Sequence, residues 1–96
     1  MGMGKILSEN RRLKILTLLL ESGGPINTEL LAIGVRRLGV PSDDDDIRAD
    51  VQWLDRAGLT SSRTVKEFIV VTVTPDGQAV ACGQKIRSGV ALPGLS

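Results

Sequence analysis

The sequence contains no histidine and only one cysteine, Cys82. A single thiol cannot close a disulfide within the chain, and without histidine neither a Cys–His zinc site nor a histidine-activated nucleophile can be assembled. A glycine-rich phosphate loop is also missing from the sequence. We therefore expect a protein that is not an enzyme, that takes no metal or cofactor, and that resides in the reducing cytoplasm.

Long apolar runs and aromatic residues are scarce as well. The most apolar stretch, residues 15–20, is far shorter than the roughly 20 residues that cross a bilayer, so we expect no membrane-spanning helix. Trp53 and Phe68 are the only aromatic residues, too few for a surface on which single-stranded nucleic acid would stack. The net charge of +1 excludes a polybasic protein. With 96 residues, 42% of them hydrophobic, the chain should form one domain with a small core.

Three helices are predicted from apolar residues at helical spacing and from polar residues that can cap the first turn. They extend from a Ser8 cap to Ser22, from an Asn27 cap to Gly39, and from a Ser42 cap to Ala57. The third helix has the clearest division between its faces. Its expected core residues are Ile47, Val51 and Leu54, and its expected solvent-facing residues are Arg48, Gln52, Asp55 and Arg56.

Beyond Gly58 the apolar period changes to two, which is typical of strands. Strands over 59–62 and 68–73, joined by a turn at 63–66, form a predicted hairpin. Thr74 and Pro75 then predict the start of a short helix that reaches Cys82, whose thiol should be buried as a small apolar group. Residues 84–96 contain glycine and proline but few periodic apolar positions, which is typical of a flexible tail or arm.

The segment Ile47–Leu59, IRADVQWLDRAGL, resembles the recognition-helix signature of the winged helix-turn-helix superfamily, and Thr74–Gly77 is similar to the turn that often follows the wing. The order of three helices, a two-stranded β-hairpin wing and a short C-terminal helix is also typical of that fold. The resemblance implies an α+β domain over residues 8–83, followed by the tail. More narrowly, residues 10–16 and the pattern Arg48-x-Asp50-x-x-Trp53-Leu54 resemble small winged-helix proteins of Mu-like phages and prophages.

The superfamily places its third helix in the major groove of duplex DNA and its wing on the backbone, so the resemblance implies a small DNA-binding regulator or accessory factor. The wide apolar face of the first helix favours a homodimer. The positions that match base-reading residues are Asp44, Asp45, Arg48 and Gln52, and those that match wing contacts to phosphate are Arg63 and Lys66. Further candidates for phosphate contacts are Arg11, Arg12, Arg36 and Arg37.

The acidic tract Asp43–Asp46 opposes this function. Residues 41–58 carry six acids and two bases, a net charge of −4, at the helix end expected to approach DNA. Capping and the helix dipole explain one or two of these aspartates, but not four. Two interpretations stay open: the tract tunes DNA binding, in part by accepting hydrogen bonds from cytosine amino groups, or it engages a basic protein partner and the domain is an interaction module. A bound Mg²⁺ or Ca²⁺ is disfavoured because consecutive helical carboxylates point in different directions.

Overall fold

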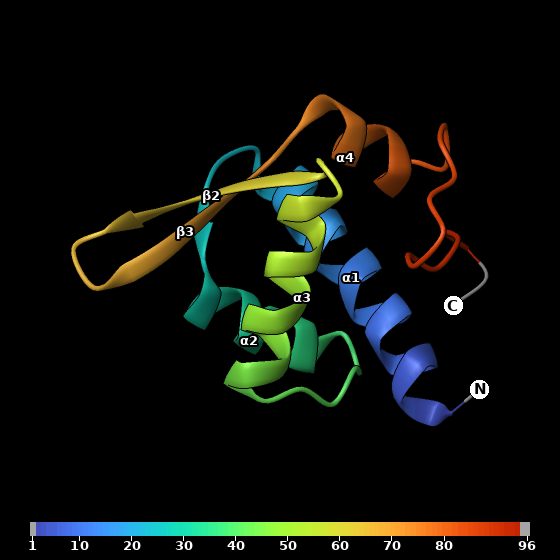
Figure 1. Cartoon of the computed structure of the whole chain (residues 1–96), viewed down its shortest axis with the longest axis horizontal. Coiled ribbons are helices and arrows are strands. Elements are labelled where there is room, and N and C mark those ends of the chain that lie inside the picture. Colours follow the sequence, from blue (N-terminus) through green and yellow to red (C-terminus); the bar gives the residue numbers. More distant parts are fainter. Residues whose placement is uncertain (1, 95–96) are drawn as a thin grey trace.

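The computed structural model describes residues 2–94, which form four helices and a three-stranded antiparallel sheet (Figure 1). The α+β class expected from the sequence is confirmed. The hairpin projects from one side of the helices, and the segment after the last helix lies on the opposite side. In chain order the elements are α1 (Met3–Ser22), β1 (Ile26–Asn27), α2 (Thr28–Arg37), α3 (Asp44–Arg56), β2 (Thr60–Val65), β3 (Phe68–Val73) and α4 (Pro75–Ala81).

Helix α1 is longer than predicted. It begins at Met3 rather than after Ser8, and its N-cap residue, Gly2, offers no side-chain hydrogen bond. Packing explains the additional residues, because Leu7 lies against the core, and a capping signal in the sequence does not reveal such a contact. The C-terminal end agrees with the prediction: the helix ends at Ser22, and Gly23 adopts the left-handed conformation with φ +70°.

Helices α2 and α3 both begin at side-chain caps. Asn27 caps α2 as predicted, since its Oδ1 accepts a hydrogen bond from the backbone nitrogen of Leu30 at 2.8 Å. Helix α3 is capped by Asp43 and not by Ser42. The Asp43 carboxylate accepts from the Asp46 nitrogen at 2.7 Å, and the Asp46 carboxylate accepts from the Asp43 nitrogen at 3.0 Å, which places the capping box one residue later than expected.

The sheet has the order β1-β3-β2, so the predicted two-stranded hairpin gains a third strand. Strand β1 is only two residues long and pairs Ile26 with Val71 and Asn27 with Val70. A two-residue strand has no sequence period of its own, which is why only the helix cap at Asn27 was predicted there. The hairpin itself is confirmed, but β2 continues to Val65, and the connection shortens to Lys66–Glu67, with Lys66 at a positive φ of 56°.

The core lies between α1 and the other elements. All three predicted inward residues of α3, namely Ile47, Val51 and Leu54, are buried. On α2, Leu31 and Val35 are buried, whereas Leu30 and the C-cap residue Leu38 are exposed. The remaining buried apolar residues are Leu13, Ile15, Leu16, Leu19, Ala32, Val40, Leu59, Val71, Val80 and Val90.

No described helix is long and apolar enough to cross a membrane.

Helix α4 begins as predicted, with the Thr74 hydroxyl accepting a hydrogen bond from the Gly77 nitrogen at 3.1 Å. Gly77 is buried, and a Cβ at this position would overlap with the carbonyl oxygen of Leu59. The prediction that Cys82 is buried is wrong, because the thiol is exposed. This seven-residue helix buries the face that carries Gly77 and Val80, and Cys82 is its C-cap residue beyond that face.

Residues 84–94, the described part of the segment after Gly83, have no regular secondary structure, and the middle of this segment folds back on α1. The nitrogen of Ala91 donates to the carbonyl oxygen of Glu9 at 3.1 Å, and the carbonyl oxygen of Gly89 accepts from Arg12 at 3.0 Å. Val90 is buried in the core. Residues 89–91 therefore contribute to the packing of the domain, beyond the boundary expected at residue 83.

Candidate functional site

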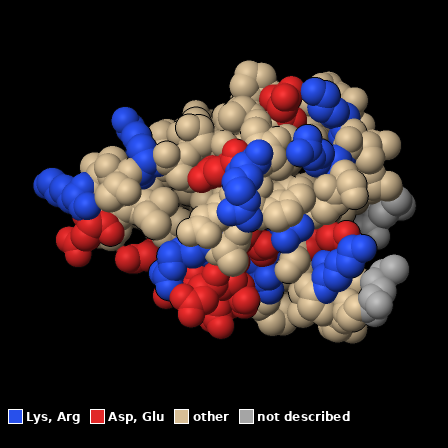
Figure 2. Space-filling model, viewed as in Figure 1, with Lys and Arg blue, Asp and Glu red and all other residues tan. Residues whose placement is uncertain are grey.

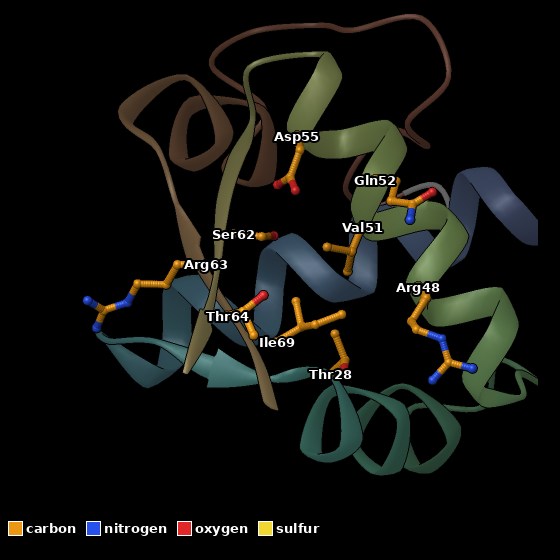
Figure 3. Close-up of a pocket in the computed structure, with 9 residues that line it drawn as sticks. All are labelled: Thr28, Arg48, Val51, Gln52, Asp55, Ser62, Arg63, Thr64 and Ile69. Carbon is orange, nitrogen blue, oxygen red and sulfur yellow. The ribbon is translucent and has the colours of Figure 1, made fainter. Parts of the chain in front are cut away.

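A groove separates the outer face of α3 from the β2–β3 hairpin (Figure 3). Its volume is about 190 Å³. Side chains from α2, α3, β2 and β3 all reach it. The lining residues are Thr28, Arg48, Val51, Gln52, Asp55, Ser62, Arg63, Thr64 and Ile69.

Three of the residues predicted to contact DNA line this groove together. Arg48 and Gln52 lie four residues apart on α3, so they share its exposed face. Arg63 comes from β2, and in Figure 3 its guanidinium extends away from the helix on the hairpin side. The structure thus places a helix and a hairpin side by side, with arginines on both sides of the space between them.

Ser62 gives the groove an unused hydrogen-bonding group. Its Oγ is buried, and no residue among 2–94 forms a hydrogen bond with it. In Figure 3 the hydroxyl points from β2 towards α3. A buried hydroxyl without a hydrogen-bond partner is energetically costly. No local pattern in the sequence indicates this residue, because its environment depends on the approach of α3 to β2.

The acidic tract gathers at the start of α3, at the lower edge of the face in Figure 2, while Lys and Arg side chains are spread over the rest of that face. Each of its aspartates interacts locally. Asp43 and Asp46 form the capping box, and Asp46 also lies 3.7 Å from Arg11. Asp44 lies 3.9 Å from Arg36, and Asp45 forms an ion pair with Arg48. Helix α3 therefore does not present an unbroken acidic field.

Arg11 does not reach the surface, contrary to its prediction as a phosphate contact. It is 5% exposed, and its guanidinium donates to Asp50 at 2.9 Å, to the Ser42 hydroxyl at 2.7 Å and to the carbonyl oxygen of Pro41 at 3.0 Å. All of these partners lie on α3 or on the link that precedes it. Arg11 thus fixes α3 against α1.

Arg12 is also used inside the domain. Its Nε donates to Asp50 at 2.9 Å, and its guanidinium carbon lies 4.1 Å from the centre of the Trp53 ring, a cation–π contact. Asp50 thus pairs with two arginines of α1. These contacts join residues 38 and 39 positions apart, which the local sequence pattern could not reveal.

The other phosphate candidates lie on the surface. Arg36 and Arg37 occupy the last turn of α2, where cations favour the helix dipole, and Arg36 also donates to the carbonyl oxygen of Ser42 at 3.0 Å. Lys66 lies in the hairpin turn and is exposed. The set of exposed candidates is therefore Arg36, Arg37, Arg63 and Lys66.

Comparison with known proteins gives one relative by sequence. The chain is 34% identical over 88 residues to the uncharacterized protein gp26 of Escherichia phage Mu, and the match covers 92% of each protein. The chain belongs to the gp26 family. No family model matches the sequence.

Two solved structures share the fold of this gp26-family chain. AF1382 from Archaeoglobus fulgidus has a TM-score of 0.63 at 16% identity, and the match covers 75% of the chain and 77% of AF1382. BpsR of Bordetella bronchiseptica, whose DNA binding is regulated by 6-hydroxynicotinic acid, has a TM-score of 0.52 at 20% identity. That match covers 73% of the chain and 47% of BpsR. At these identities the likeness establishes the fold alone.

Proposed function

We propose that this gp26-family protein is a winged-helix protein that binds duplex DNA, as a phage regulator or accessory factor. In this proposal α3 enters the major groove and the β2–β3 hairpin is the wing. The observation that carries it is the groove between α3 and the hairpin, which Arg48 and Gln52 line from α3 and Arg63 lines from β2. A helix with polar side chains fits the major groove, and cations on an adjacent hairpin fit the flanking phosphates. The fold shared with BpsR supports the same function.

The candidate contacts divide by chemistry. Arg48 and Gln52 carry donors that pair with guanine and adenine edges, and the carboxylates of Asp44 and Asp45 can accept from the cytosine amino group. Arg63 and Lys66 on the hairpin carry charge suited to phosphate. Arg36 and Arg37 at the end of α2 are a second pair of phosphate candidates. Arg11 and Arg12 are not proposed as phosphate contacts, because both are bound to Asp50.

In this proposal the acidic tract lowers the affinity of the protein for DNA. Asp45 holds Arg48 in an ion pair, so Arg48 must exchange a carboxylate for a base or phosphate when DNA binds. The exposed carboxylates also repel the DNA backbone. Both effects lower the affinity for random sequence, and a site with a cytosine near Asp44 or Asp45 would recover part of it.

The alternative is an interaction module that engages a basic protein through the same tract. Local capping and ion pairs account for much of the acidic charge, and Arg48 and Arg56 interrupt it along α3. This arrangement favours DNA over a basic partner. The homodimer also remains a proposal. Leu16 and Leu19 of α1 are used in the core, so a dimer would have to use exposed residues such as Met3 and Ile6 near the start of that helix.

The proposal is tested by fluorescence anisotropy with a labelled mixed-sequence duplex of about 30 bp, roughly three helical turns, at several salt concentrations. We expect binding that weakens steeply with salt and that strengthens in the double variant Asp44→Asn/Asp45→Asn. Glu21→Gln, which removes one exposed acid on α1, is the control and should have little effect. Absence of binding at low salt by both the wild type and the double variant contradicts the proposal, and a pull-down with basic partners then tests the alternative.

A further inference from the structure

A second hollow lies near the C-terminal end of α3 and shares no lining residue with the hairpin groove. Its volume is about 180 Å³, and it is lined by Trp53, Arg56, Ala57 and Arg87. Two of these residues are exposed arginines, one from the last turn of α3 and one from the segment after α4.

Both guanidinium groups are available to a ligand. Within residues 2–94, neither Arg56 nor Arg87 takes part in an ion pair or a side-chain hydrogen bond. Asp55, adjacent to Arg56 in sequence, lines the hairpin groove instead and accepts from the Thr60 hydroxyl at 2.6 Å. A helix C-terminus favours a cation, which explains Arg56 without a ligand. The exposed Arg87 lies outside any helix, so the helix dipole does not explain a cation there.

The segment that carries Arg87 is anchored next to the hollow. Arg12 donates to the Gly89 carbonyl oxygen at 3.0 Å while its guanidinium lies over the Trp53 ring. Gly89 has a φ of +99°, and a Cβ there would lie 2.7 Å from Cη2 of Trp53, so only glycine lets the backbone pass this close to the ring. Arg87 is two residues from this contact and is therefore held near Arg56.

We propose that Arg56 and Arg87 form a phosphate clamp, in which both guanidinium groups bind phosphate of the DNA backbone. The clamp would lie just outside the DNA major groove that α3 enters. Planar guanidinium groups match phosphate oxygens in a bidentate manner. Arg48, Gln52 and Arg56 are spaced four residues apart, so the clamp continues the exposed stripe of α3 at the end away from the acidic tract. This inference deepens the proposed function and depends on it for the source of the phosphate. A free phosphate group has the same chemistry.

The test compares Arg56→Gln, Arg87→Gln and the double variant with Lys85→Gln. Lys85 lies in the same segment and already pairs with Asp76 at 2.9 Å, so its loss controls for a change of net charge. The first readout is the salt dependence of duplex binding. We expect the slope of log K against log salt to fall by about one for each single arginine variant and by about two for the double variant, and to stay near wild type for Lys85→Gln.

The second readout separates the clamp from DNA binding as a whole. Trp53 is the only tryptophan and lines the hollow, so its fluorescence reports on occupancy. We expect duplex DNA to change this fluorescence in the wild type and not in the double variant. If DNA binds but both arginine variants behave as Lys85→Gln does, the clamp is contradicted and the proposed function stands. If no duplex binds but inorganic phosphate changes Trp53 fluorescence only when both arginines are present, the site takes free phosphate, and the function is contradicted. No response to either probe overturns both.

Discussion

The guanidinium of Arg11 and the carboxylate of Asp50 form a buried ion pair, with Nη1 and Oδ2 2.9 Å apart and side chains only 7% and 5% exposed. Arg12 binds the second oxygen of the same carboxylate. One aspartate thereby fixes α3 to α1. This contact sets the position of the exposed face of α3 that carries Arg48 and Gln52. The geometry of the hairpin groove therefore depends on charges that lie outside it.

Replacement of Asp50 should destabilise the domain strongly. Asp50→Ala leaves the guanidinium of Arg11 buried without its carboxylate, and loss of one partner of a buried pair costs about 3–5 kcal/mol. The measurement is urea denaturation followed by far-ultraviolet circular dichroism. Asp45→Ala is the matched control, because Asp45 is 88% exposed, and an exposed pair contributes about 1 kcal/mol or less. Equal costs for the two variants would show that the buried pair does not hold the helices.

The core prediction concerns two leucines with no exposed area. Leu16→Ala on α1 and Leu54→Ala on α3 should each lower the free energy of unfolding by about 2–5 kcal/mol, because each leaves a cavity. Leu30→Ala on α2, where the side chain is 57% exposed, should change it by only about 0.5 kcal/mol. A cost below about 1 kcal/mol for either buried leucine, in the same denaturant melts, would contradict the assigned core.

A side chain at Gly77 should destabilise the domain. Gly77→Ala would place a methyl group against the Leu59 carbonyl oxygen and 2.7 Å from Cγ2 of Val73, so α4 must shift away from the hairpin. We expect a loss of about 1–3 kcal/mol, the usual cost of overpacking, seen as a lower Tm. Gly24→Ala is the control, because a Cβ there has no neighbour within 4 Å and the backbone does not require glycine. If the two variants have the same Tm, α4 does not pack this closely against Leu59 and Val73.

The two kinds of DNA contact should separate in binding assays. Lys66→Ala should weaken binding to all sequences alike and lower the salt slope by about one, because it removes a phosphate contact. Arg48→Ala and Gln52→Ala should instead change which sequences are preferred, as judged by selection from a random duplex library. The same uniform loss in all three variants would reject this division between hairpin and helix.

Local sequence patterns predicted much of the fold. The inward residues Ile47, Val51 and Leu54, the cap at Asn27 and the start of α4 at Thr74 follow from periodicity and capping chemistry, which act within one or two turns. The failures involve long-range partners. Strand β1 exists because Val71 is there to pair with Ile26, and helix α1 extends to Met3 because Leu7 finds the core.

The candidate site was predicted in part. Arg48, Gln52 and Arg63 do line one groove, since residues on the outer face of a helix and on a following hairpin come together in this order of elements. The roles of Arg11 and Arg12 were missed because a buried arginine looks the same in sequence as an exposed one. Their partner, Asp50, is itself buried on the inner side of α3, and a charged residue at such a position is the signal that a buried ion pair was needed.

The most direct test of the central claim is to map duplex DNA onto the protein by NMR, from changes in the backbone amide shifts of the labelled protein on titration. We predict that the largest changes fall at Arg48, Gln52 and Arg63, with changes in the hairpin turn at Lys66, while amides near Glu21 at the C-terminal end of α1 stay unchanged. Shifts confined to surfaces away from α3 and the hairpin, or no shifts with any duplex at low salt, would contradict it.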